Sequence, residues 1–383
     1  MKTFDVAIVG GGLIGVSIAF ELAAAKLRVV VLDRQEPGRE ASWAAAGMLS
    51  PAPDSLGDAP LVPLARESLR LYPEFVAALE EGSRKSAGYR RDGAMEIFLS
   101  PHGEAERDSR ICALRELQIA AEPISLATAR EWEKSIGPRA QGVAWLPEEG
   151  SVEPRSLMEA ALAAAQHRGV EVRSNCHVTS LLRAQDRCAG VIAGGERIAA
   201  SHVVVAAGCS SGEIPFETGA RARYSPTRPV RGQMVALRPR AASLRRILRS
   251  ERGYLVPRRD GRIVAGSTLE DVGFDKRVTD EGVRRILDVA FELCPELAES
   301  QLLETWAGLR PGTPDDLPIL GPSGIEGLLI ATGHYRNGIL LAPVTAKLMR
   351  EWIVEERTAF DAEPFSPLRF MRSEPQPEKV QPK

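Results

Sequence analysis

The N-terminal residues 3–33 contain the pattern that most restricts the fold of this chain. An apolar run at 6–9 (VAIV) is typical of a strand buried on both faces of a parallel sheet. Gly10, Gly12 and Gly15 follow in the spacing GxGxxG, and a helical stretch comes next. In this spacing the first glycine allows a tight turn, the second lets the backbone approach a pyrophosphate, and the third lets the helix pack closely on the strand. The segment therefore predicts a dinucleotide-binding βαβ unit.

An acid at the end of the second predicted strand strengthens that prediction. Residues 28–32 form another apolar strand and end at Asp33, which lies 23 residues after Gly10. A carboxylate at this distance accepts hydrogen bonds from ribose hydroxyls, and the N–H groups of the helix N-terminus suit phosphates. The alternative is a glycine turn in a βαβ unit that holds no ligand. The pattern does not distinguish FAD from NAD, although the small, apolar residues 38–51 suit an extended cofactor or a flat ring.

Composition narrows the classes of function. A length of 383 residues exceeds a usual single domain and favours two. A formal net charge of −2 gives no basic footprint for nucleic acid, and no uncharged apolar run reaches the length of about 18 residues that a membrane span needs. The five cysteines lack metal-ligand spacing, so we expect no metal site and reduced thiols. The chain enters a strand at once, without a signal-peptide pattern, which predicts a cytoplasmic protein.

Periodicity predicts further elements along the chain. Helices are expected at 61–79, 104–119, 127–134, 154–167, 280–292 and 338–352, and a strand at 94–99. Residues 202–208 (HVVVAAG) are typical of a late strand of the same parallel sheet, so the nucleotide domain is expected to be discontinuous. Strand patterns dominate 223–304, which favours a second, antiparallel domain. Residues 366–383, rich in Pro and charge, are expected to form a flexible tail.

Longer motifs point to a family. They are GGGLIG (10–15), AAAGML (44–49), PVRGQ (229–233), YLVPRRDGRIVAGST (254–268), WAGLRPGTPDDLPILG (306–321) and GHYRNGILLAP (333–343). With them the chain resembles the FAD-dependent amine oxidases related to D-amino acid oxidase, and above all the glycine oxidases of thiamine biosynthesis. The resemblance implies an α/β plus α+β fold: a Rossmann-like FAD-binding domain from 1–85, 151–222 and 305–365, and an antiparallel substrate-binding domain from 86–150 and 223–304. It also implies oxidation of a small amino acid's C–N bond to an imine, with dioxygen reduced to peroxide.

The resemblance further assigns residues to the cofactor. Besides the glycine motif and Asp33, they are Leu13, Ile14, Arg34, Ala41, Ser42, Ala46, Gly47, Met48, Val178, Gly208, His334, Tyr335, Arg336, Asn337, Gly338, Ile339 and Leu340. The related sarcosine oxidases attach flavin covalently to a cysteine near the motif LRPGT. No cysteine lies there in this chain, so noncovalent FAD is expected.

Arg310 is the leading candidate for holding the substrate. It lies in a segment with almost no other charge, WAGLRPGT, and a guanidinium holds a carboxylate through two parallel hydrogen bonds. The resemblance adds Tyr254 and Arg336 as substrate-binding neighbours, and Met48 on the flavin side. The alternative for Arg310 is an ion pair with an internal carboxylate such as Asp315.

Two further features concern the loop after residue 333. Hydride leaves a neutral amine readily, so no strong base is expected, and the lone His334 is assigned to flavin packing or backbone bonding. Gly338 is predicted to begin a helix whose N–H groups face the flavin's pyrimidine carbonyl, where negative charge gathers on reduction. An ordinary packed helix start is the alternative.

Two positions depart from the resemblance. Trp43 stands where the family tends to have a small residue, and packing beside the loop is one account of it. If 252–256 is a regular strand, Arg252 shares a face with Tyr254 and adds a third positive charge to the pocket. That charge would favour a second anionic group or a bulkier D-amino acid. The alternative is a solvent-facing arginine in a basic stretch.

The sequence thus predicts an FAD-dependent oxidase of glycine or a small D-amino acid, with dioxygen as the second substrate. Within the class, the alternatives are a D-amino acid oxidase or dehydrogenase of broader or dicarboxylic specificity and a sarcosine oxidase. From another class, the alternative is a dinucleotide-binding protein without activity, since fold does not dictate function. Relatives commonly associate, so a homo-oligomer is expected, with no interface assigned.

Overall fold

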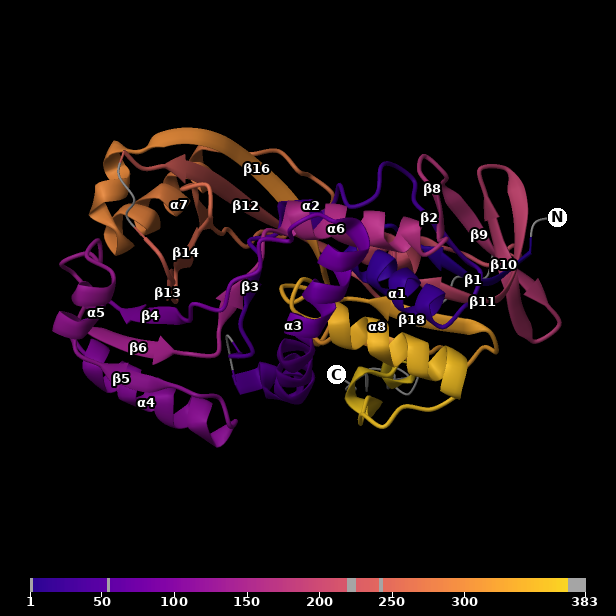
Figure 1. The fold of residues 1–383 in the computed structure, drawn as a ribbon, viewed down its shortest axis with the longest axis horizontal. Coiled ribbons are helices and arrows are strands. Elements are labelled where there is room, and N and C mark those ends of the chain that lie inside the picture. Colours follow the sequence, from indigo (N-terminus) through magenta and orange to yellow (C-terminus); the bar gives the residue numbers. More distant parts are fainter. Residues whose placement is uncertain (1–2, 54–55, 219–224, 241–243, 371–383) are drawn as a thin grey trace, which may run out of the picture.

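Two large sheets, one toward each end of the molecule, organise the chain (Figure 1). The structure, a computed structural model, describes residues 3–53, 56–218, 225–240 and 244–370. Within these ranges, none of the helices has the length and apolar character that a bilayer crossing requires.

The first sheet contains the predicted nucleotide-binding unit. Its strand order is β17-β18-β11-β1-β2-β8, and β9 and β10 extend it from β11. The strands are β1 (Thr3–Val9), β2 (Val29–Leu32), β8 (Glu171–Arg173), β9 (Val178–Ala184), β10 (Arg187–Ala193), β11 (Glu196–Val205), β17 (Ile319–Pro322) and β18 (Leu328–Thr332). β1 pairs in parallel with β2 and β11. Val6 and Ile8 enter one buried cluster while Ala7 and Val9 enter another, which confirms a strand buried on both faces.

Four helices cover one face of this sheet. They are α1 (Leu13–Ala24), α3 (Val62–Ser83), α6 (Pro154–His167) and α8 (Ala342–Arg350). Their apolar side chains form one core with Val6, Ile8 and Val29. Pro154 begins α6 as predicted, because a missing N–H costs no bond in the first turn of a helix.

The second sheet has the strand order β16-β12-β15-β14-β13-β4-β6-β5. The strands are β4 (Ala94–Phe98), β5 (Glu122–Ile124), β6 (Gly142–Leu146), β12 (Arg228–Arg238), β13 (Ile247–Ser250), β14 (Gly253–Pro257), β15 (Ile263–Gly266) and β16 (Gln301–Gly312). The helices α4 (Gly103–Glu116), α5 (Leu126–Trp132) and α7 (Asp280–Leu293) border it. The antiparallel prediction holds except that β13 pairs with β4 in parallel. These two strands come from distant segments, so no hairpin dictates their direction.

Short elements complete the chain. A four-residue helix α2 (Ala41–Ala44) precedes β3 (Met48–Leu49), which pairs with β7 (Gly150–Ser151). The 3-10 turns are Leu56–Leu61, Gly208–Glu213, Pro295–Glu299, Glu363–Phe365 and Pro367–Phe370, and a π-helical turn, Glu351–Glu355, extends α8.

Three predicted bounds differ from the ends of the observed elements. The proposed domain border at 305 falls inside β16, whose residues pair with β12 from Gln301 to Gly312. The last helix begins at Ala342 and not at Gly338, because residues 337–341 form a single turn closed by a 2.8 Å bond from Leu341 N–H to the Asn337 carbonyl. The predicted tail starts too early, since Pro367–Phe370 is a 3-10 turn; residues 371–383 lie outside the described ranges.

Candidate active site

Two connected cavities run from the glycine motif to the second sheet. The nucleotide cavity is lined by Gly10, Gly12, Asp33, Arg34, Val178 and neighbouring residues. The inter-sheet cavity is lined by residues of both sheets and of the segments between them, including Leu13, Met48, Tyr254, Arg310 and Arg336. Both share Ala41, Ala206, Gly208, Leu309 and Pro311, so together they form one elongated space. A dinucleotide with a ring system at one end has this extended shape.

The glycine turn and Asp33 shape the nucleotide cavity. Gly10 has φ +109°, and a β-carbon there would overlap the Ala206 carbonyl, so only glycine fits. A β-carbon on Gly15 would overlap the Gly10 carbonyl, which explains the close helix–strand packing predicted for it. Asp33 accepts hydrogen bonds from the N–H groups of Gly11 (2.7 Å) and Gln35 (2.9 Å). Burial raises the pKa of the Asp33 carboxyl. A carboxylate fixed at the cavity wall suits ribose hydroxyls, so these residues fit a dinucleotide.

The segment 41–50 lines the inter-sheet cavity with small residues. Ala41, Ser42, Ala46, Gly47 and Met48, all predicted, are among its lining residues. Ser42 Oγ accepts the N–H of Leu13 at 2.9 Å and so joins this segment to the start of α1.

Trp43 packs on the side of segment 41–50 that faces away from the cavity. It does not line either cavity; its ring lies 3.6 Å from the Arg155 guanidinium and packs edge-on against Trp306. Trp306 in turn donates its indole N–H to the Ala44 carbonyl at 3.0 Å. The position is thus a packing site behind the loop, as suggested for it.

Strand register brings the substrate-side residues onto one face of the second sheet. In adjacent strands, Arg249 is opposite Tyr254, Tyr254 is opposite Gly266, and Gly266 is opposite Met234. Directly paired residues point to the same side, so Arg249, Tyr254 and Met234 line the cavity together. The Tyr254 hydroxyl lies over Gly266 and reaches Met234 Sδ at 3.5 Å.

Arg310 lies on that face, and no carboxylate of the residues that the structure describes pairs with it. Its guanidinium donates to Ser267 Oγ at 2.7 Å and to the Thr268 carbonyl at 3.2 Å. It lies across Gly232, where a β-carbon would overlap it. Among the described residues, none of the ion pairs involves Arg310, although burial lowers the pKa of its guanidinium. The suggested partner Asp315 instead binds Arg369 at 2.7 Å, so that alternative was wrong.

The inter-sheet cavity is positively charged. Its lining contains Arg249, Arg310 and Arg336 but no Asp or Glu among the residues that the structure describes. Behind the lining, Arg249 pairs with Glu96 at 2.8 Å and with Glu149 at 3.1 Å. Arg310 therefore differs from Arg249 in having no acid among the described residues to balance its charge, and a partly buried cation of this kind marks an anion site.

The loop after β18 supplies the rest of the lining. The residues of this loop that line the cavity, all expected to contact the cofactor, include His334, Tyr335, Asn337, Gly338 and Ile339. His334 Nε2 lies 3.0 Å from Thr345 Oγ1, and burial lowers the His334 pKa to about 3. The imidazole is therefore neutral near pH 7, which fits the structural role expected of it. The side chain of Leu340 does not line the cavity: it lies in the core, and the Leu340 carbonyl accepts the Ser68 hydroxyl at 2.6 Å, so its contact with the cofactor stays a prediction.

Arg252 was also assigned wrongly to the pocket. It lies in the two-residue turn between Ser250 and Gly253, which pair across the hairpin, and β14 begins only at Gly253. Its side chain is 59% exposed and binds Glu292 at 2.7 Å. The solvent-facing alternative is the one that the structure supports.

Several lining residues were missed from the sequence. They include Ala44, Ser50, Gly232, Met234, Arg249, Phe274 and Gly308. Gly232 and Gly308 lie in motifs that were noticed, and period-two alternation from Arg310 would have put Gly308 on its face. Arg249 could have been placed in the cavity from the sequence only if the turn at 251–252 had been recognised. No sequence signal marked Phe274.

Comparison with known proteins agrees with this geometry. Residues 5–352 match the model of a family described as FAD dependent oxidoreductase. The chain belongs to that family. It is 38% identical to the bifunctional protein ThiO/ThiG of Trichormus variabilis over 93% of this chain, and spans 53% of that relative's length, about half. It is 35% identical to a glycine oxidase of Pseudomonas aeruginosa, over 94% of this chain and 98% of the relative. The crystal structure of glycine oxidase from Geobacillus kaustophilus superimposes with a TM-score of 0.89 at 32% identity, covering 96% and 98% of the two chains. The family's cofactor, FAD, fits the two connected cavities.

Proposed function

We propose that this chain oxidises the C–N bond of glycine or another small amino acid. One observation carries the proposal: the guanidinium of Arg310 faces the inter-sheet cavity with no carboxylate of the described residues beside it. A substrate carboxylate supplies the missing anion through two parallel hydrogen bonds, which fix both its position and its plane. The similarity to proteins named glycine oxidase supports the same reaction.

The other residues have separate tasks. Tyr254 and Arg336 line the cavity beside Arg310, where a hydroxyl donor and a second cation favour a carboxylate. Met48 and the small residues of 41–47 give the cofactor's ring a flat, uncharged wall. The nucleotide cavity, with Asp33 at one wall, holds the adenosine half.

Bound FAD supplies a two-electron acceptor that dioxygen can reoxidise. The substrate loses a hydride from its α-carbon and a proton from nitrogen, which leaves an imine; dioxygen gains two electrons and two protons and leaves as hydrogen peroxide. Water then converts the imine to the oxo acid and ammonia. No Asp or Glu of the described residues lines the inter-sheet cavity, and His334 is turned to Thr345. The substrate amine must therefore react in its neutral form, so kcat/KM is expected to rise with pH as the amine loses its proton.

The cofactor is proposed to be held noncovalently. Among the described residues that line the inter-sheet cavity there is no cysteine, and the neighbouring Cys209, in the nucleotide cavity, donates its thiol to the Leu309 carbonyl at 3.5 Å. Burial raises the pKa of the Cys209 thiol to about 12, which makes it a poor nucleophile. Acid precipitation should therefore release all of the flavin into the supernatant.

A colour change tests the proposed reaction. Purified protein should be yellow, lose its visible absorbance when glycine is added under nitrogen, and regain it in air with formation of peroxide. A screen of sarcosine, D-alanine and D-aspartate in the same peroxide assay ranks the substrates. A yellow protein that no small amino acid or amine bleaches would favour a dinucleotide-binding protein without activity. The expected homo-oligomer stays a prediction, which light scattering tests.

A further inference from the structure

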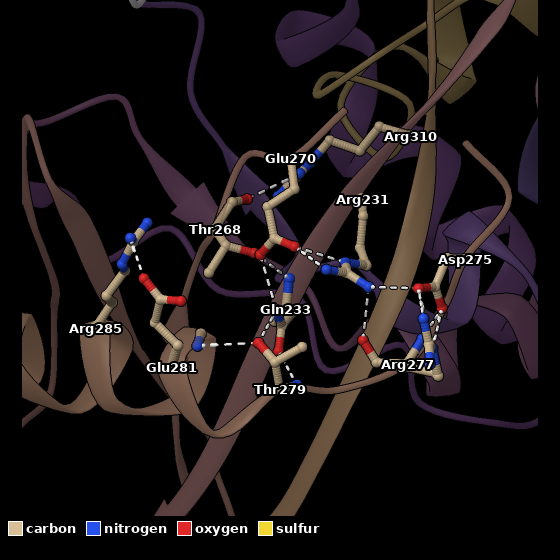
Figure 2. A network of polar contacts seen from close by, with 11 residues as sticks. Arg231, Gln233, Thr268, Glu270, Asp275, Arg277, Thr279, Glu281, Arg285 and Arg310 are labelled. Atoms are coloured by element: carbon tan, nitrogen blue, oxygen red, sulfur yellow. Dashed lines mark hydrogen bonds and ion pairs between the residues drawn. The ribbon is translucent and has the colours of Figure 1, made fainter. Parts of the chain in front are cut away.

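A polar network on the other face of β12 holds the residues that contact Arg310 (Figure 2). We call residues 267–279, which connect β15 to α7, the bridging segment. Its first two residues, Ser267 and Thr268, accept the hydrogen bonds of the Arg310 guanidinium. The position of these two residues therefore decides where the guanidinium lies.

Glu270 is the centre of this network. Arg231 donates to Glu270 Oε2 from Nε at 2.6 Å and also from Nη2, while Gln233 donates to Oε1 at 2.7 Å (Figure 2). The backbones of Arg231 and Glu270 pair with each other at 2.9 and 3.0 Å. The Gln233 backbone N–H donates to Thr268 Oγ1 at 2.9 Å. The motif PVRGQ thus fixes the start of the bridging segment.

The rest of the bridging segment runs to the nucleotide cavity. Phe274 lines that cavity, and Lys276 pairs at 3.1 Å with Glu40, the residue before α2. At the far end, the Thr279 backbone donates to Gln233 Oε1 at 2.8 Å and the Thr279 hydroxyl caps α7. The segment is thus anchored at Thr268, Glu270, Lys276 and Thr279, and Glu270 is the charged anchor closest in sequence to the two residues that hold Arg310.

This anchoring holds the Arg310 guanidinium in position before an anion binds, and this affects the affinity for the anion. A free arginine side chain has many rotamers, and the entropy lost on fixing one of them weakens the binding of an anion. Ser267 and Thr268 hold two of the guanidinium's N–H donors in advance, which directs the remaining ones to an incoming carboxylate.

We propose that Glu270 is a positioning residue for the carboxylate site. Held by Arg231 and Gln233, it keeps Ser267 and Thr268 against Arg310 and so sets the affinity for the substrate's carboxylate. The proposal rests on the proposed function, in which Arg310 binds that carboxylate.

Binding of acetate, a carboxylate without an amine, tests the proposal in the FAD-loaded protein. Acetate should perturb the visible absorbance of the flavin, which gives its Kd. Glu270→Ala is expected to raise the Kd of acetate and the KM of glycine about tenfold while kcat at saturation stays within about twofold, because the change affects placement of the carboxylate alone. Glu270→Gln keeps the size and one acceptor oxygen, and should restore most of the affinity.

Two further variants make the test specific. Glu281→Gln removes the same charge from an exposed pair with Arg285 on α7 and should change none of these values. Ser267→Ala leaves the Arg231–Glu270 pair intact and should raise the acetate Kd even if Glu270→Ala does not fold.

The outcomes separate the two proposals. If Arg310→Ala binds acetate as the wild type does, the proposed function fails. If Arg310→Ala loses acetate binding but the Glu270 and Ser267 variants keep wild-type affinity, only the positioning role is overturned. A fall of kcat together with FAD content in folded Glu270→Gln would also overturn it, because general loss of structure would then explain the effect.

Discussion

Arg231 of β12 and Arg310 of β16 lie on neighbouring strands, but their guanidiniums have different partners and different roles. Arg231 is only 5% exposed and is paired with Glu270 and Asp275 on the face away from the cavity. Arg310 faces the cavity, and its acceptors are a hydroxyl and a carbonyl. Arg231 is buried and Arg310 is partly buried, and within the described residues only Arg231 is paired with acids. The paired arginine therefore stabilises the fold, and the unpaired one is available to an anion.

Removing Arg310 should have the largest effect on activity and little effect on folding. Arg310→Ala is expected to lower kcat/KM for glycine about a thousandfold, since loss of a buried charged partner costs about 4 kcal/mol. The free energy of unfolding should stay the same or rise, because the variant no longer has a partly buried positive charge that lacks an acidic partner. Steady-state kinetics and urea unfolding measure the two quantities. Full activity of Arg310→Ala would contradict the binding role of Arg310, and unfolding of the variant would show that Arg310, like Arg231, stabilises the fold.

Removing Arg231 should have the opposite result. Arg231→Ala leaves Glu270, whose side chain is 22% exposed, without its cation, which is expected to cost about 2 kcal/mol of the free energy of unfolding. Urea unfolding of the FAD-loaded protein measures it. Replacing both partners, Arg231→Met with Glu270→Met, is the matched control and should cost clearly less. Equal stability of wild type and Arg231→Ala would show that the pair is not structural.

His334 sharpens the comparison as a buried group that stays uncharged. Its pKa is lowered to about 3 in the folded state by burial, and is about 6.5 when unfolded. Between these values the unfolded chain binds more protons, so stability is lost as pH falls from about 6.5 toward 3, by about 1.4 kcal/mol per pH unit. His334→Asn should lose this slope. Unfolding free energies at three pH values in that window test it, and an unchanged slope in the variant contradicts the assignment.

Gly232 tests whether the Arg310 guanidinium needs the space that the missing side chain of this glycine leaves. A β-carbon there would overlap Arg310, so Gly232→Ala should displace the side chain and raise the KM of glycine about tenfold, a cost of about 1 kcal/mol that is typical of mild overpacking. FAD content should be unchanged, because the adenosine half binds elsewhere. Wild-type KM in this variant would mean that Arg310 can bind substrate from another rotamer.

Arg252 should have the smallest effect of all. Arg252→Ala removes the pair between an exposed guanidinium and Glu292, which is worth about 0–1 kcal/mol because Glu292 keeps Arg139 at 2.7 Å. The change should leave turnover of glycine and D-aspartate unchanged in the peroxide assay. Selective loss of D-aspartate turnover would return Arg252 to the pocket.

The sequence was most informative where backbone geometry allows one residue type. Gly10 and Gly15 have no room for a side chain, and the apolar run of β1 has two buried faces, so the nucleotide unit could be predicted in full. The sequence was also informative at Arg310, which has few charged neighbours along the chain and no ion pair with an acid among the described residues.

The sequence was least informative where residues meet through strand pairing. Arg249 reaches the cavity because a two-residue turn puts it opposite Tyr254. If the register were shifted by one residue, Arg249 would point to the other face of the sheet and a neighbouring residue would face the cavity. The role of PVRGQ depends on Glu270, 39 residues from Arg231, which no local pattern connects to it. Leu340 fits a pocket by its place in a loop, but one turn of backbone directs it into the core.

A crystal structure of the FAD-loaded protein with acetate tests the central claim most directly. The account predicts acetate oxygens about 3 Å from both terminal nitrogens of Arg310, with the Tyr254 hydroxyl as a further donor. Acetate bound only to Arg336 or Arg249, with Arg310 still turned to Ser267 and Thr268 alone, would contradict it.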